Sequence, residues 1–154
     1  MRKIILPVMM LIVFCAFSLN AQEREKFDPK KDPSKDLKTA VKIASKENKN
    51  ILLDVGGEWC PWCHRLDEFI LGDKEINNYM HSNFVVVKVN WSPENKNEKF
   101  LSQYPKVPGY PHLFVLDKKG KLIHSQDTGA LEQEKSYSKD KLMSFLQKYS
   151  VKKK

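Results

Sequence analysis

The chain has 154 residues, 41% of them hydrophobic and 30% charged, and its formal net charge is +8. This composition excludes collagen-like, low-complexity and multi-pass membrane proteins, and the length suits one domain with a single hydrophobic core. Basic residues are interspersed with acids along the chain, and only the run 152–154 is purely basic. The net charge therefore does not indicate a nucleic-acid-binding protein.

An apolar segment opens the chain. Residues 4–19 read IILPVMMLIVFCAFSL, follow Arg2 and Lys3, and lead to Ala21. This layout is typical of a secretory signal, whereas a membrane-spanning helix needs about 20 apolar residues. We expect a signal peptide over residues 1–21, whose cleavage after Ala21 leaves 133 residues with a charge of +6. The mature protein is then periplasmic or secreted, and an uncleaved N-terminal anchor is the alternative.

Helices and strands are predicted to alternate along the mature chain, because its hydrophobic periodicity switches between the two patterns. A polar lead-in (22–36) precedes one domain (37–150) and a basic tail (151–154). Helices are predicted at 36–47, 61–71, from Asp73 onward, at 94–104 and at 142–149. Strands are predicted at 51–55, 84–89, 112–116 and 121–126, with a turn at 117–120. This order predicts an α/β fold, a central mixed β-sheet with helices on both faces and a C-terminal β-hairpin plus helix.

The mature chain keeps two cysteines, Cys60 and Cys63, in the sequence Cys-Pro-Trp-Cys, because Cys15 leaves with the signal. Exported proteins usually use cysteines for structural bridges, but a bridge across two intervening residues constrains the unfolded chain very little. The spacing therefore favours a reactive pair, or metal or haem attachment, and an inert bridge is the alternative.

Cys60 is predicted at the start of a helix, where free backbone N–H groups and the helix dipole stabilise a thiolate. Pro61 suits the first helical position, and Cys63 lies on the same helical face. We expect an exposed attacking thiolate at Cys60 and a resolving thiol at Cys63, as thiol–disulfide exchange requires. His64, four residues after Cys60, is a possible thiolate modulator when protonated; a plain surface histidine is equally compatible with the sequence.

The segment DVGGEWCPWCHRL resembles the active-site segment of the thioredoxin superfamily. Asp54, six residues before Cys60, matches the buried acid beneath the resolving cysteine of that family. Lys88, in VVVKVN, matches the lysine beside that acid. The pair Tyr110-Pro111 matches the cis-proline that faces the cysteines, and TGAL at 128–131 resembles the glycine segment after the last hairpin.

The resemblance extends over residues 37–149 and implies a thioredoxin fold and an exported protein thiol–disulfide oxidoreductase of the thiol-reducing branch. The implied catalytic residues are Cys60, Cys63, Asp54 and Lys88. The implied substrate-binding residues are Trp59, Trp62, Tyr110 and Pro111, with Trp59 packed beside the site and Trp62 facing solvent. The cofactor is then the Cys60–Cys63 disulfide itself, without metal. The implied partners are protein thiols and disulfides and an upstream electron donor. The protein itself is expected to be a monomer.

Three departures from the family pattern bear on substrate and redox potential. The residues between the cysteines are Pro-Trp rather than Gly-Pro, Gly56 stands where the family has tryptophan, and 132–137 is an apparent insertion.

Two other kinds of protein fit parts of the sequence. Cys60 to His64 also forms CxxCH, the attachment motif of c-type haem; His64 would then be an axial ligand, with Met80, Met143 or His112 as the other. The strong strand patterns disfavour this alternative, because small c-type cytochromes are largely helical. A non-catalytic binding module on a thioredoxin fold is the second alternative.

Overall fold

The computed structural model describes residues 24–152. The predicted signal peptide, its cleavage position and the end of the basic tail lie outside these residues. The helices are α1 (Pro33–Glu47), α2 (Pro61–Gly72), α3 (Lys74–Asn83), α4 (Glu98–Leu101) and α5 (Lys139–Tyr149). The strands are β1 (Asn50–Gly56), β2 (Phe84–Asn90), β3 (His112–Leu116), β4 (Leu122–Asp127), β5 (Glu132–Gln133) and β6 (Ser136–Tyr137). Within residues 24–152, no helix combines the length and the apolar character that crossing a membrane requires.

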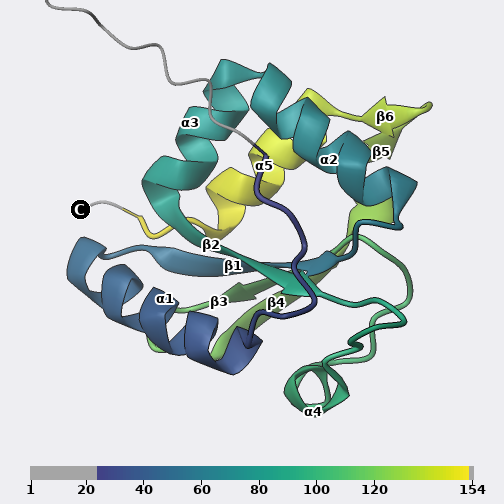
Figure 1. Ribbon diagram of the computed structural model, residues 1–154. Coiled ribbons are helices and arrows are strands. Elements are labelled where there is room, and N and C mark those ends of the chain that lie inside the picture. Colours follow the sequence, from purple (N-terminus) through teal and green to yellow (C-terminus); the bar gives the residue numbers. More distant parts are fainter. Residues whose placement is uncertain (1–23, 153–154) are drawn as a thin grey trace, which may run out of the picture.

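Four strands form the central sheet in the order β2-β1-β3-β4. Strand β1 runs parallel to β2 and antiparallel to β3, and β3 pairs antiparallel with β4. Helix α1 covers one face of this sheet, while α2, α3 and α5 cover the other (Figure 1). The predicted α/β fold, with a mixed sheet between two helical layers and a hairpin and helix at its end, is confirmed.

The helices begin where side chains satisfy their free N–H groups. Asp32 accepts from the backbone nitrogen of Ser34 at 2.9 Å, and Pro33 takes the first helical position of α1. The helix therefore starts three residues before the predicted 36. Asp73 caps α3 in the same way, with 3.0 Å to the backbone nitrogen of Glu75.

The helix predicted at 94–104 is mostly absent, and only the four residues of α4 are helical. Side-chain amides hold the preceding chain as a loop. Asn90 donates to the carbonyl of Asn95 at 2.8 Å, and Asn97, which adopts a φ of 48°, donates to the carbonyl of Asn90 at 2.7 Å. Asparagine readily forms such local bonds in place of helical ones.

The apparent insertion at 132–137 is a small hairpin made of β5 and β6. It lies beside the start of α2 (Figure 1), and Tyr137 at its end is buried. The hairpin therefore extends the protein next to the cysteines.

Candidate active site

Cys60 and Cys63 form a disulfide at the start of α2. Cys60 is the extended residue that caps the helix, and the backbone N–H of Cys63 donates to its Sγ at 3.1 Å. The two residues are 2% and 1% exposed, because Phe27, Trp62 and Tyr110 pack against them. The expectation that Cys60 is exposed is therefore wrong for the disulfide state, because Trp62 from between the cysteines and Phe27 and Tyr110 from distant parts of the chain cover it.

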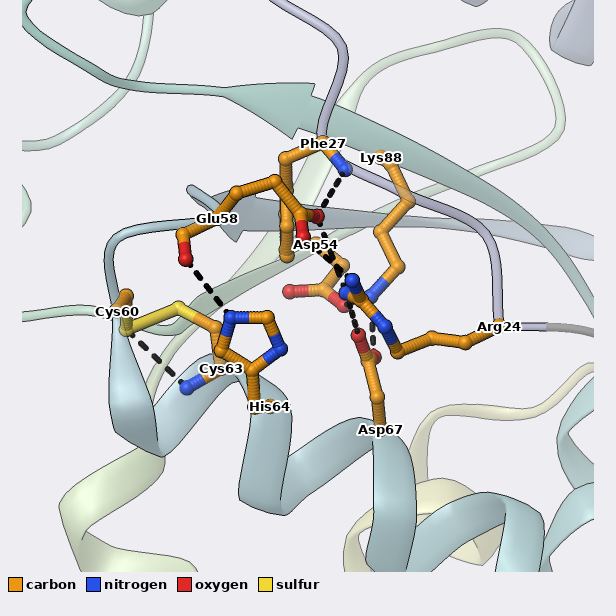
Figure 2. A network of polar contacts seen from close by, with 9 residues as sticks. All are labelled: Arg24, Phe27, Asp54, Glu58, Cys60, Cys63, His64, Asp67 and Lys88. Atoms are coloured by element: carbon orange, nitrogen blue, oxygen red, sulfur yellow. Dashed lines mark hydrogen bonds and ion pairs between the residues drawn. A yellow bond between two sulfur atoms is a disulfide. The ribbon is translucent and has the colours of Figure 1, made fainter.

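Asp54 and Lys88 form a buried ion pair beside the disulfide (Figure 2). They face each other across the parallel β1–β2 pairing, and Lys88 Nζ lies 2.7 Å from Asp54 Oδ2. A second carboxylate, that of Asp67 on α2, also accepts a hydrogen bond from Lys88. One ammonium group is thus shared between two buried carboxylates.

Burial raises the pKa of Asp54 above its ordinary value; the Lys88 charge opposes this rise and the Asp67 charge adds to it. Burial also disfavours the charged form of Lys88, but the two carboxylates outweigh it and raise the pKa of Lys88. Among the residues described, none donates a hydrogen bond to Asp54 Oδ1. Asp54 is therefore a carboxylate with a free lone pair and an increased affinity for a proton.

Asp67 was missed in the sequence, although a signal for it exists. Cys63, Leu66, Asp67 and Ile70 fall at i, i+3, i+4 and i+7 and are all buried on one face of α2. Phe69, an apolar residue of the same helix, is by contrast only half-buried. A charged residue in an apolar helical stripe requires a buried partner, and here that partner is Lys88.

The lead-in also reaches the site, which its polar composition did not predict. Phe27 is 2% exposed, and its backbone N–H donates to Glu58 Oε1 at 2.8 Å. Arg24 forms an ion pair with Glu58, and its Nη1 donates to Asp67 Oδ2 at 3.2 Å. A Cβ at Gly56 would lie 2.5 Å from Cys63 Sγ and 3.0 Å from the Phe27 ring, so this close approach requires glycine.

Aromatic side chains form the rim beside Cys60. Trp59 is 48% exposed, and its indole N–H donates to the carbonyl of Trp91 at 2.7 Å. Trp91 stacks on Tyr110 with 4.7 Å between ring centroids. Trp62 is half-buried, with its ring 5.7 Å from that of Tyr137. Trp59 therefore packs beside the site as predicted, against Trp91 and Tyr110, but also faces solvent. The prediction that Trp62 faces solvent is wrong, because Tyr137 of the β5–β6 hairpin packs against it.

Pro111 and His64 complete the set of predicted site residues. The peptide bond between Tyr110 and Pro111 is cis, and the carbonyl of Pro111 accepts a hydrogen bond from Thr128 Oγ1 at 2.6 Å. His64 lies 2.8 Å, through Nε2, from the carbonyl oxygen of Glu58. His64 therefore contacts the loop that leads into Cys60.

The fold, with a disulfide at the start of α2, is that of a thioredoxin-like domain. A family model described as a thioredoxin-like domain matches residues 37–141, and the chain belongs to this family.

Two curated relatives match parts of the chain. The disulfide bond reductase DsbH of Chlamydia pneumoniae is 30% identical over 93 residues, which are 54% of this chain and 55% of that protein. Spermatogenesis-associated protein 20 of Rattus norvegicus is 46% identical over 46 residues, 30% of this chain and 6% of that protein. The chain thus spans about half of the first relative's length and a small part of the second's.

Solved structures agree with the fold. A disulphide isomerase from Xylella fastidiosa Temecula1 superposes with a TM-score of 0.69 at 24% identity, over 79% of this chain and 94% of that one. The oxidised C-terminal domain of DsbD from Neisseria meningitidis superposes with a TM-score of 0.56 at 18% identity, over 81% and 99%. At these identities the likeness concerns the fold.

Proposed function

We propose that this chain is an exported reductant of protein disulfides that uses Cys60 and Cys63 as its redox pair. The observation that carries the proposal is the position of the disulfide, at the start of α2 and beside the buried Asp54–Lys88 pair (Figure 2). A capped helix start stabilises a thiolate, and a buried carboxylate beside it accepts a proton.

Cys60 makes the first attack. In the reduced protein its thiolate is stabilised by the N–H of Cys63 and by the helix dipole. The thiolate attacks one sulfur of a substrate disulfide, the substrate S–S bond breaks, and the other substrate sulfur leaves as a thiolate that takes a proton from water. The product is a mixed disulfide between Cys60 and the substrate.

Cys63 resolves this intermediate. Its thiol passes the proton to Asp54, and the resulting thiolate attacks the sulfur of Cys60, so that the Cys60–Cys63 disulfide forms and the second substrate sulfur is released. Two electrons have moved from the cysteine pair to the substrate. Lys88 stabilises Asp54 while it is ionised, and an upstream dithiol donor then reduces the pair again.

The aromatic rim is the proposed substrate contact. Trp59 offers an exposed apolar surface beside Cys60. Tyr110 and Pro111 directly precede β3, and Trp62 lies between the two cysteines. An extended substrate segment can pair with the backbone before Pro111 in the manner of an added strand. Trp59 is thereby expected to contribute more to substrate affinity than the covered Trp62.

The direction of electron flow is argued from charge. Two carboxylates, Asp54 and Asp67, share one lysine near the pair, and a nearby carboxylate disfavours the negative thiolate of the reduced state. A weakly stabilised thiolate gives a reducing potential, near the ~−270 mV of thioredoxin rather than the ~−120 mV of a strong oxidant. The matching relative that is named a disulfide bond reductase supports this direction.

The apolar segment at residues 4–19 supports export to an oxidising compartment, where a reductant of protein disulfides needs a donor to keep it reduced. We propose that the mature protein acts there as a monomer. Neither metal nor organic cofactor is required, because the cysteine pair carries both electrons.

The test is the reduction potential of the Cys60–Cys63 pair, measured by equilibration with dithiothreitol and glutathione buffers. We expect a value close to the thioredoxin end of the range and catalysis of insulin reduction by dithiothreitol. A potential above about −150 mV, on the scale set by these family values, would identify an oxidant instead. The control is the Cys60→Ser, Cys63→Ser double variant, which must be inactive.

The site favours exchange over attachment of a c-type haem. Both cysteine sulfurs bond to each other, and His64 contacts the carbonyl of Glu58. His112 lies on the α1 face of the sheet, against Phe114. A Soret absorption band in the purified protein would reverse this preference.

A further inference from the structure

The segment before α1 contacts the redox pair although it lies outside the matched thioredoxin-like region. Residues 24–32 run from beside α2, across the end of the parallel strands, to the start of α1 (Figure 1). The family match begins at residue 37. Any contact that residues 24–32 make with the site therefore comes from outside the matched thioredoxin-like domain.

Phe27 is the residue of this segment that enters the interior. It packs against both cysteines, and the absence of a side chain at Gly56 leaves the space for its ring. Lys88 Nζ lies 4.3 Å from the centre of the same ring. One aromatic ring thus contacts both the redox pair and the lysine of the acid pair.

Polar contacts fasten the segment on both sides of Phe27. Glu58 accepts from the N–H of Phe27 and pairs with Arg24, which also reaches Asp67 (Figure 2). Further along, the side chain of Asn95 donates to the carbonyl of Pro29 at 2.8 Å. The ring is therefore held in place by the loop that carries Cys60 and by the loop after β2.

We propose that Phe27 is a positioning residue of the redox centre, which closes to water the side of Cys63 and of Lys88 that its ring covers and so controls the resolving step. The inference rests on the proposed exchange reaction. A packed ring leaves no room for water, whereas a polar cavity of sufficient size fills with it. Removal of the ring would solvate the thiol and the acid together.

Several charged or titratable groups surround Asp54, and they come from every element that packs around it. A cavity of about 90 Å³ next to the acid is lined by Arg24, Glu25, Asp67, His81 and Lys88 among others. Tyr137 from β6 interacts electrostatically with Asp54 as well. Substitution of Phe27 changes none of these charges, so a change in the titration of Asp54 would report altered solvation.

The first experiment measures protection of Cys63 in the reduced Cys60→Ser protein, by its rate of alkylation with iodoacetamide. Phe27→Ala should accelerate alkylation on the order of tenfold, because a cavity open to water replaces a packed ring. Phe27→Leu restores apolar volume and should stay near the parent rate. Phe100→Ala, which removes a buried ring on the opposite face of the sheet, should also stay near it.

The second experiment follows the rate of Cys60–Cys63 disulfide formation in a preformed mixed disulfide as a function of pH. With Phe27→Ala, the pH midpoint should fall, because solvation weakens the burial that raises the pKa of Asp54. Phe27→Leu and Phe100→Ala should keep the parent midpoint. An Arg24→Gln variant, which loosens the segment without removing the ring, should accelerate alkylation of Cys63 by a smaller factor than Phe27→Ala.

Unchanged alkylation and an unchanged midpoint in Phe27→Ala would overturn the inference, as would equal changes in Phe100→Ala. If the parent protein reduces insulin while Phe27→Ala behaves like it, only the inference fails. If the parent protein does not reduce insulin, the proposed function fails independently of these measurements.

Discussion

The two faces of strand β1 differ sharply, although neighbouring residues of one short segment build them. Leu53 and Val55 point into an apolar cluster between the sheet and α1, while Asp54 between them points toward α2 and the disulfide. Both kinds of residue are buried. The difference lies in what the opposite layer supplies, since α2 brings a second acid and the cysteine pair.

The two faces therefore contribute differently to the stability of the protein and to its reaction. An apolar layer gains free energy from burial alone, whereas buried charges incur a desolvation cost that their pairing offsets only in part. The α2 face keeps Asp54, Lys88 and Asp67 despite this cost, and the lead-in adds Arg24 to the same network. We therefore expect substitutions on this face to change the reaction and those on the α1 face to change mainly the stability.

The largest effect is expected at the cysteines of the α2 face. Cys60→Ser should abolish insulin reduction and form no mixed disulfides, because the attacking sulfur is lost. Cys63→Ser should accumulate mixed disulfides with substrates, because nothing resolves them. Non-reducing electrophoresis followed by mass spectrometry measures both. Trapping by the Cys60→Ser protein, with none by Cys63→Ser, would reverse the assigned roles.

The next effect is expected at the acid. Asp54→Asn preserves shape but removes the proton acceptor, so resolution should slow on the order of 10²-fold at neutral pH, while the first attack changes little. Stopped-flow single-turnover kinetics separates the two steps. Glu68→Gln is the matched control, because it removes an exposed acid from the same helix as Asp67. Equal resolution rates in the parent and Asp54→Asn would leave Asp54 with a structural role alone.

On the α1 face, Leu53→Ala should lower the free energy of unfolding by about 2–5 kcal/mol, because it opens a cavity at a side chain with 0% exposure. The rate of insulin reduction per folded molecule should be unchanged. Urea unfolding and activity assays in parallel test this, with Ile43→Ala, an exposed residue of α1, as the control. A loss of activity beyond the unfolded fraction would contradict the separation between the faces.

The smallest effect is a pH dependence of stability. Burial raises the pKa of Asp54 above 3.8, so the folded protein binds a proton that the unfolded chain has already released. The resulting stabilisation is full below about pH 3.8 and is lost as the pH rises through the raised pKa. Asp54→Asn lacks this contribution, so its unfolding free energy relative to the parent should increase as the pH rises from about pH 4 through the raised pKa. A constant or decreasing difference would contradict the raised pKa.

Local patterns were sufficient for most of the fold. The runs ILLDV and FVVVKV form β1 and β2, and Pro61 and Gly72 bound α2 as predicted. They succeed because strand alternation, caps and breakers act over a few residues. The helix expected at 94–104 is mostly absent, and the reason is again local. Hydrogen bonds among Asn90, Asn95 and Asn97 satisfy backbone carbonyls there in place of helical bonds.

The amino-acid pattern was enough to predict the order of helices and strands along the chain, the position of the cysteine pair at a helix start and, through the thioredoxin resemblance, the pairing of Asp54 with Lys88. Only the tertiary structure decided that Asp67 shares the lysine, that Phe27 covers the cysteines, and that Trp59 rather than Trp62 faces solvent. These three results depend on segments that are far apart in the chain. Hydrophobic periodicity predicts which face of a helix or strand is buried. It does not predict which distant side chain packs against that face.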